Sequence, residues 1–304
     1  MTMRSMNDIP FQSGRRAVIT GTGGLGYEAA RALCRAGAQV ILAGRNAAKG
    51  ADAVGRIRAA MPGVRITFEH LDLASLDSVG DFAARLGAAW GTLDLLINNA
   101  GVMVPPRRQQ TADGFELQWG VNYLGHFALT AHLLPLLRTG RNPRVISLSS
   151  IAARNGTIDF DDLNAARSYR PMPAYSQSKL ACLMFALELQ RRSEAAGWGI
   201  TSMAAHPGVS RTDLLHNGPG RRSPSGMART YLWFLFQPAE RGALPMLYAA
   251  TAPEATGGGY YGPRRMSELR GFPAPARIPP QAEDRGTAAR LWEVSQVLAR
   301  VRFA

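Results

Sequence analysis

The chain has 304 residues, 46% of them hydrophobic and 19% charged, a size and composition that suit one large α/β domain. Its formal net charge is +13, but the basic residues are spread along the chain in short pairs, so we expect a solvated basic surface and no nucleic-acid partner. The two cysteines, Cys34 and Cys182, suggest no disulfide framework, so we expect a cytoplasmic protein. No apolar run has the length of a signal peptide or a membrane span.

Short apolar runs alternate with amphipathic stretches as far as about residue 205. We predict strands at residues 17–20, 39–43, 65–71, 93–98, 144–149 and 200–205. We predict helices at residues 25–36, 47–60, 75–90, 118–137 and 174–196. This alternation predicts the α/β class, with a single doubly wound parallel sheet of the Rossmann type and helices on both of its faces.

The pattern loosens after residue 206. The elements predicted there are a short helix at 227–236, a longer helix at 239–250, a strand entered through residues 257–261, an extended segment at 270–280 and a closing helix at 282–301. We therefore expect one domain over residues 1–304, with a substrate lid at 213–238 and a C-terminal extension at 265–304.

Glycine or polar residues follow every one of the predicted strands. They are Gly21, Gly44, Asp72, Asn99, Ser150 and His206. Ligands of parallel sheets bind outside the carboxyl ends of the strands, so these positions predict one binding edge. Neither His206 nor His126 belongs to a ligand-spaced cluster, so we predict no metal site and expect His206 to make a loop hydrogen bond.

The segment T-G-T-G-G-L-G, residues 20–26, joins the first predicted strand to the first predicted helix. Gly21, Gly23 and Gly26 match the fingerprint G-x-G-x-x-G, whose glycines let the backbone approach a pyrophosphate. The free N–H groups and the dipole of the following helix attract the same anion. The loop therefore predicts a dinucleotide site, with an ordinary glycine-rich turn as the alternative.

The second predicted strand ends without the acidic residue that would bind a ribose 2′-hydroxyl. Arg45 stands there instead, with Lys49 one turn later, and an arginine fork binds a phosphate bidentately. We therefore favour NADP(H) over NAD(H) as the cofactor. The alternative is that Arg45 is a solvated loop charge.

Tyr175 and Lys179 are four residues apart near the start of a predicted helix, so they share a face. A lysine cation one turn away favours the phenolate, which suits the tyrosine for proton transfer to a carbonyl oxygen as hydride arrives. Ser150, at the end of the fifth predicted strand, is placed to stabilise developing charge on that oxygen. A lone Tyr-x-x-x-Lys pair is usually a helix-surface pair, so the prediction depends on these residues acting together.

Several ordered segments resemble the short-chain dehydrogenase/reductase superfamily over about residues 15–215. They are the glycine loop, Asp72-Leu73, Asn98-Asn99-Ala100-Gly101, Asn122, Ser150, Tyr175 with Lys179, and Pro207-Gly208 with Thr212. The resemblance implies that Ser150 and Tyr175 flank the carbonyl. It implies that Lys179 holds the nicotinamide ribose and that Asn122 positions a proton-relaying water. It also implies cofactor contacts from Gly21, Gly23, Gly24, Leu25, Gly26, Arg45, Asp72, Leu73, Asn99, Ala100, Gly101, Tyr175, Lys179, Pro207, Gly208, Val209 and Thr212.

A closer likeness is to retinol-dehydrogenase-like members of that superfamily, which include broad carbonyl reductases. It rests on residues 41–50, 149–183 and 206–214. The 25 positions from Ser150 to Tyr175 are also typical of this subgroup. The glycine loop is one residue shorter than the family's T-G-x-x-x-G-x-G, so Gly21, Gly24 and Gly26 align with it only across a gap.

The predicted lid carries an apolar aromatic run at residues 231–236. One interpretation is a wall that selects a lipophilic ketone, aldehyde or alcohol; core packing and shallow membrane-surface contact are the alternatives. We predict an NADP(H)-dependent oxidoreductase, and as a second class a non-catalytic dinucleotide-binding regulatory or scaffold protein. By resemblance, the helices at 118–137 and 174–196 are the faces of a homodimer or homotetramer.

Overall fold

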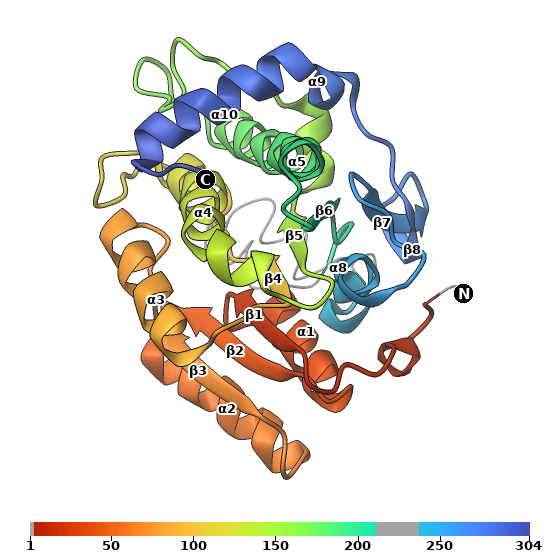
Figure 1. The fold of residues 1–304 in the computed structure, drawn as a ribbon. Helices are drawn as coiled ribbons and strands as arrows, with labels where there is room; N and C mark the ends of the chain where they lie inside the picture. The colour runs from red at the N-terminus through yellow and green to blue at the C-terminus, as the bar shows by residue number, and fades with distance from the viewer. Residues whose placement is uncertain (1–2, 211–236) are drawn as a thin grey trace.

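The computed structural model describes residues 3–210 and 237–304 (Figure 1). Within them, one eight-stranded sheet has the order β3-β2-β1-β4-β5-β6-β7-β8. The strands are β1 (Arg16–Thr20), β2 (Gln39–Gly44), β3 (Ile66–His70), β4 (Leu95–Asn98), β5 (Arg144–Leu148), β6 (Thr201–Ala205), β7 (Tyr260–Arg265) and β8 (Arg270–Pro275). Neighbouring strands run parallel except β7 and β8, which pair antiparallel. The predicted doubly wound parallel sheet is confirmed, with an antiparallel strand added at one edge.

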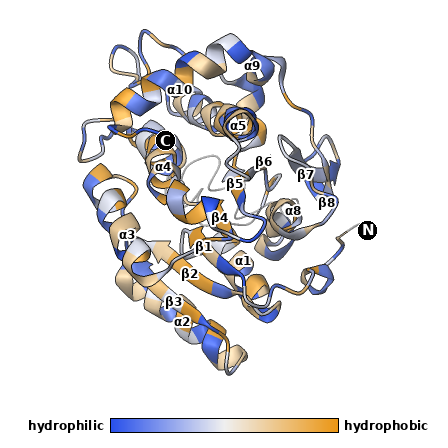
Figure 2. Ribbon diagram, viewed as in Figure 1, coloured by the Kyte–Doolittle hydropathy of each residue, from blue (hydrophilic) through white to orange (hydrophobic). Residues whose placement is uncertain are grey.

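Helices cover both faces of this sheet. One face carries α3 (Leu76–Ala89), α4 (Gly125–Arg138) and α5 (Pro171–Ala196), and the other carries α1 (Gly24–Arg35), α2 (Ala47–Ala60) and α8 (Ala239–Thr251). Successive strand side chains point to opposite faces, so Val18 enters the first core and Ile19 the second. Figure 2 shows hydrophobic residues along the central strands and mixed colouring on helices such as α2 and α10. Burial on both faces explains why these strands are apolar throughout.

The helix ends follow local capping signals. The side chain of Ser75 accepts a hydrogen bond from Ser78 N and begins α3, as its position predicted. Helix α5 begins at Pro171, ahead of the predicted residue 174, because the fixed φ of proline suits a first helical turn. The helix ends at Ala196 and is capped by Gly197, whose φ of +65° is the left-handed conformation that glycine adopts easily.

Two helices predicted as single elements are divided in the structure. The helix predicted at 118–137 is a π-helical segment, η2 (Trp119–Leu124), followed by α4. The helix predicted at 282–301 is α9 (Pro280–Glu283) and then α10 (Arg285–Ala299). Asp284 separates them, and its carboxylate caps α10 by accepting a hydrogen bond from Thr287 N. Hydrophobic periodicity does not register such local changes in backbone hydrogen bonding.

The C-terminal extension is part of the folded core. Strand β8 completes the sheet edge, and α10 lies across α4 and α5 (Figure 1). Trp292 of α10 stacks on Phe185 of α5 with ring centroids 5.8 Å apart, and Tyr123 Oη lies 2.7 Å from Ser295 Oγ. The two helices predicted to face an oligomeric partner therefore contact the chain's own α10, and the dimer or tetramer stays a prediction.

Thr212, the helix predicted at 227–236 and nearly all of the predicted lid lie outside the described residues. Among the helices that are described, none has the length and apolar character needed to cross a bilayer. The described histidine, cysteine and acidic side chains form no cluster able to hold a metal ion.

Candidate active site

The carboxyl edge of the sheet borders a cavity of about 870 Å³. The predicted site residues that line it are Gly21, Gly23, Gly24, Leu25, Arg45, Asp72, Leu73, Asn99, Ala100, Gly101, Ser150, Tyr175, Lys179, Pro207, Gly208 and Val209. Gly26 and Asn122 are buried beside this lining. The structure therefore brings the predicted catalytic and cofactor positions together around one cavity, except for Thr212, which it does not describe.

Steric crowding or a positive φ explains three of the four glycines in the loop at 21–26. Gly21 has a φ of +94°, and a Cβ there would lie 2.8 Å from Nδ2 of Asn99. A Cβ at Gly26 would collide with the carbonyl oxygen of Gly21, and Gly24 has a φ of +51° where α1 begins. Gly23 has a φ of −127° and open space where a Cβ would stand. The backbone of the turn therefore favours glycine at positions 21, 24 and 26, the gapped match, and gives no steric reason for glycine at 23.

Thr20, the last residue of β1, links the glycine loop to two other elements. Its Oγ1 accepts hydrogen bonds from the backbone N–H groups of Asn99 and Ala100, both at 2.9 Å, and lies 2.8 Å from Nε2 of His126. Burial lowers the pKa of His126 to about 4, so the ring is neutral at pH 7. The carbonyl oxygen of Asn122, 2.9 Å from Nδ1 of His126, can only accept, so we assign the imidazole proton to Nδ1, and Nε2 accepts from the Thr20 hydroxyl. No short motif marks this contact, since it joins residues 106 positions apart.

Asn122 lies in the π-helical segment η2, where the backbone bonds skip one more residue than in an α-helix. Its carbonyl oxygen accepts hydrogen bonds from Nδ1 of His126 at 2.9 Å and from Sγ of Cys182 at 3.1 Å. Its side chain bonds both backbone polar groups of Val102, at 2.7 and 3.0 Å, and donates to Oγ of Ser178 at 3.0 Å. These bonds hold the loop that follows β4 against α5.

Tyr175 and Lys179 lie one turn apart on α5, and both are buried at the cavity wall. Nζ of Lys179 donates to the carbonyl oxygen of Leu148 at 2.9 Å and lies 5.9 Å from the centroid of the Tyr175 ring. Gly101 leaves room for the neighbouring amide, because a Cβ there would lie 3.0 Å from Oδ1 of Asn122. The predicted sharing of one helix face is confirmed.

Ser150 lies two residues after the end of β5 and caps the short helix η3 (Ile151–Asn155). Its Oγ accepts a hydrogen bond from Ala152 N at 3.2 Å. The preceding Ser149 donates through its hydroxyl to the carbonyl oxygen of Lys179 at 2.7 Å. Strand β5 and helix α5 are thereby joined where both border the cavity, which brings Ser150 to the same cavity as the tyrosine and lysine.

The glycine-loop end of the cavity carries the cations Arg45 and Lys49, and we call it the cationic end. Arg45 and Lys49 are exposed there, one after β2 and the other in the first turn of α2. Among the described residues Arg45 makes no ion pair, whereas Arg56 stacks over Tyr27 at 4.5 Å and pairs with Asp52 at 3.5 Å. An arginine with no acidic partner, next to a glycine-rich turn, suits a phosphate group.

His206 directly follows β6 and makes the loop hydrogen bond that its position predicted. Its Nδ1 accepts from Gly208 N at 3.3 Å, and its Nε2 donates to the carboxylate of Glu268 at 2.9 Å. Burial lowers the pKa of His206 below its usual range, which favours the neutral ring required for these two roles. Glu268 carries no sequence signal of its own, because it lies in the turn between β7 and β8, far along the chain.

Comparison with known proteins places these features in a wider group. A family model described as short chain dehydrogenase matches residues 15–220. Polyprenol dehydrogenase of Mus musculus is 47% identical over 261 residues, which cover 83% of this chain and 76% of that protein. Retinol dehydrogenase 13 of Homo sapiens is 42% identical over 288 residues, covering 93% of this chain and 83% of that protein. A crystal structure of an uncharacterised protein from Mycobacterium paratuberculosis matches with a TM-score of 0.82 at 40% identity, covering 100% of both chains.

Proposed function

This chain belongs to the short-chain dehydrogenase family, as a retinol-dehydrogenase-like oxidoreductase of CH–OH groups, and on that premise we propose that it interconverts a lipophilic ketone or aldehyde and its alcohol with NADP(H). The observation that carries the proposal is the meeting of Tyr175, Lys179 and Ser150 with the glycine loop at one cavity. A scaffold that had only kept the fold would need no buried tyrosine and lysine there.

The described residues fit a dinucleotide cofactor. The crowded contact between Gly21 and Gly26 keeps the backbone of the turn tight beside the cavity, and α1 begins there with its free N–H groups. Arg45 and Lys49 supply positive charge for a 2′-phosphate, which is why we propose NADP(H) over NAD(H). The bound cofactor would supply or accept the hydride.

We assign the proton transfer to Tyr175. In reduction its hydroxyl donates a proton to the carbonyl oxygen, and in oxidation the phenolate removes the proton of the alcohol. The Lys179 ammonium, close to the Tyr175 ring, stabilises the phenolate left behind. The Ser150 hydroxyl would hydrogen-bond the same substrate oxygen and stabilise its developing negative charge.

Asn122 has a structural part in this proposal. Its side chain holds Val102, which lines the cavity, and bonds Ser178 in the helix turn that carries Tyr175 and Lys179. The predicted water relay at Asn122 remains part of the proposal. It would return a proton to the tyrosine after each turnover.

The lipophilic substrate is proposed from two observations. Similar proteins are a polyprenol dehydrogenase and retinol dehydrogenases. The cavity wall also carries apolar side chains at Val102, Met103 and Ile151, next to the proposed catalytic groups. An apolar wall with a few convergent polar groups suits a lipophilic substrate with one reacting oxygen.

The test is single-turnover mixing of the protein with NADPH and a panel of long-chain and aromatic aldehydes, with NADPH binding measured separately by fluorescence. We expect turnover by the natural chain. In Tyr175→Phe the rate should fall by about 10²- to 10⁴-fold, the range for a lost general acid, with NADPH binding nearly intact. Tight NADPH binding without turnover of any aldehyde in the panel would instead favour a regulatory or scaffold protein.

A further inference from the structure

The turn between β7 and β8 has an unusual backbone. Met266, Ser267 and Glu268 follow one another with φ values of +52°, +53° and +70°. Residues with side chains rarely adopt this left-handed conformation, and three in succession are unfavourable. Such a conformation persists only where the surrounding contacts over-determine it, and it is found mostly at functional sites.

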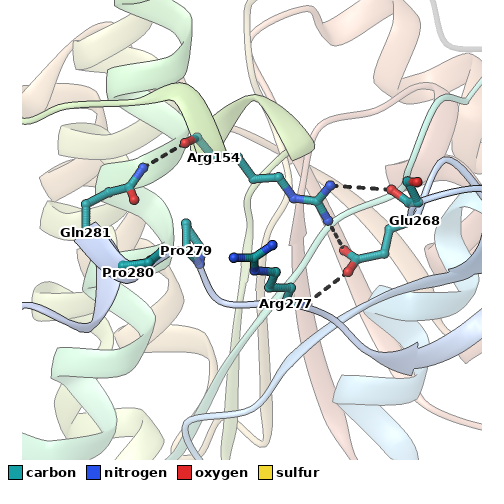
Figure 3. A pocket seen from close by; sticks show the side chains of 7 residues that line it. Arg154, Glu268, Arg277, Pro279, Pro280 and Gln281 are labelled. Carbon is teal, nitrogen blue, oxygen red and sulfur yellow. Dashed lines mark hydrogen bonds and ion pairs between the residues drawn. The ribbon is translucent and has the colours of Figure 1, made fainter.

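The side chain of Glu268 makes the contacts that hold this turn (Figure 3). Its Oε2 accepts from Nη2 of Arg154 at 2.6 Å and from Nε2 of His206 at 2.9 Å, and its Oε1 accepts from Arg277 N at 3.0 Å. Burial by itself would raise the pKa of Glu268, but the hydrogen bonds from His206 and Arg277 and the charge of Arg154 hold it below its usual range. The carboxylate is therefore ionised at neutral pH and joins three separate segments of the chain.

One of these segments forms a rim of the active-site cavity. The bond from Gly208 N to His206 Nδ1 fixes the turn after β6, and the carbonyl oxygen of Leu269, next to Glu268, accepts from Val209 N at 2.8 Å. Gly208 has a φ of +61°, and a Cβ there would collide with the same Leu269 carbonyl group. The β7–β8 turn is thus fitted closely against residues 207–209, which line the cavity.

The second segment carries Ser150. Arg154 belongs to η3, the short helix that Ser150 caps. A second link runs parallel to the first, because Tyr260 packs on the His206 ring with centroids 5.1 Å apart and its hydroxyl donates to the Ser150 carbonyl oxygen at 3.4 Å. Glu268 therefore bridges the segment that carries Ser150 and the turn at 207–209.

Glu268 does not itself line the active-site cavity. Together with Arg154, Arg277 and Gln281 it lines a separate cavity of about 390 Å³ (Figure 3). No residue lines both cavities. Its influence on the reaction must pass through His206 and Arg154. This placement distinguishes it from Tyr175, Ser150 and Lys179.

We propose that Glu268 is a positioning residue for the oxidoreductase reaction: its carboxylate holds the turn at 207–209 and the Ser150 segment at a fixed separation across the cavity. The proposal rests on the proposed function, because it concerns the alignment of the substrate carbonyl with the hydride donor. Misplacement of reacting groups by about 1 Å is enough to lower a rate by about 10²-fold. Loss of the bridge should therefore slow the hydride-transfer step and leave the affinity for NADPH, which depends on the cationic end of the cavity, nearly unchanged.

The experiment compares Glu268→Gln with the natural chain. Glutamine keeps the size of the side chain but removes the negative charge that Arg154 and His206 share. We expect the single-turnover rate of aldehyde reduction to fall by roughly 10- to 100-fold, with the dissociation constant of NADPH changed less than about threefold. The kinetic isotope effect with 4-deuterated NADPH should rise as hydride transfer becomes slower, and Glu268→Asp should restore part of the rate.

Glu293→Gln is the matched control, because it removes a carboxylate of α10 that pairs with Arg192 of α5 and lines neither cavity. A Glu268→Gln protein that is folded and reduces aldehydes at the control's rate overturns the proposal. If Glu268→Gln fails to fold, Arg154→Gln removes the same ion pair from its other end and serves as the test. A slower hydride-transfer step with intact NADPH binding in that variant supports the proposal, and an unchanged rate overturns it. If the natural chain binds NADPH but turns over no substrate, the proposed function itself has failed, and this proposal falls with it.

Discussion

The cofactor edge of the sheet and the C-terminal extension are built from different kinds of contact. At the cofactor edge, short segments carry the chemistry, such as the loop at 20–26 and the pair Tyr175 and Lys179 on one helix turn. The extension has no such motif, yet it supplies strand β8, the Glu268 bridge and helix α10 over α4 and α5. A region that looks like an appendage in sequence is, in this fold, part of both the core and the support of the active site.

The largest loss of stability is expected from a substitution at Trp292, which tests whether the C-terminal extension belongs to the core. Its side chain is 2% exposed and packs on Phe127, Phe185 and Phe303, with ring centroids 4.3–5.8 Å apart. Trp292→Ala should lower the free energy of unfolding by about 3–5 kcal/mol, since it empties a large buried site. Urea denaturation measures this directly.

The control lies on the same helix. Val297 is 68% exposed, and Val297→Ala should change the free energy of unfolding by no more than about 0.5 kcal/mol. Equal small effects of the two substitutions would mean that α10 is an appendage after all, and the face of α4 and α5 would then be free for the predicted oligomer.

The features that could be predicted from the sequence are those that short segments of the chain determine by themselves. The doubly wound parallel sheet and the meeting of Ser150 with Tyr175 follow from apolar periodicity and from the rule that ligands bind at strand ends. The contact of Thr20 with His126 and the bridge from Glu268 to Arg154 could not be predicted, because each joins distant residues through side chains common in any surface loop. The π-helical segment at Asn122 was hidden for another reason: its side chains keep a helical period while only the backbone bonding changes.

A second prediction concerns His126, a long-range contact within the cofactor edge itself. Its pKa is about 4 in the folded chain because of burial, against about 6.5 when unfolded. Between these values the unfolded chain binds a proton that the folded chain does not, so stability is lost as the pH falls from about 6.5 to 4. The shift corresponds to a loss on the order of 3 kcal/mol.

The measurement is the free energy of unfolding across that pH window for the natural chain and for His126→Asn. The variant lacks this titration, so its stability should fall less steeply with acid, while all carboxylates titrate alike in both proteins. Parallel curves would show that the ring is not held neutral between Thr20 and Asn122, and the cofactor edge would then depend on local contacts alone.

A third prediction tests the cationic end of the cavity. Arg45→Ala should raise the KM for NADPH by roughly 10- to 150-fold, equivalent to about 1.5–3 kcal/mol for a lost charged hydrogen bond. The KM for NADH should change little, because NADH has no 2′-phosphate. Arg65→Ala removes an exposed arginine that does not line the cavity and controls for net charge. Equal changes with both cofactors would contradict the proposed NADP(H) preference.

The smallest effect is expected within the glycine loop, between two residues that the fingerprint treats alike. Gly26→Ala should destabilise the fold by about 1–3 kcal/mol, because its Cβ would press on the Gly21 carbonyl group. Gly23→Ala should shift stability by less than about 1 kcal/mol, since its backbone is extended and a Cβ meets open space. Thermal unfolding of both variants without cofactor isolates this steric difference. NADPH titration then reports separately whether the backbone at Gly23 must approach a phosphate. A Gly23→Ala protein as unstable as Gly26→Ala would contradict the prediction, and the shape of the loop would then depend on contacts outside it.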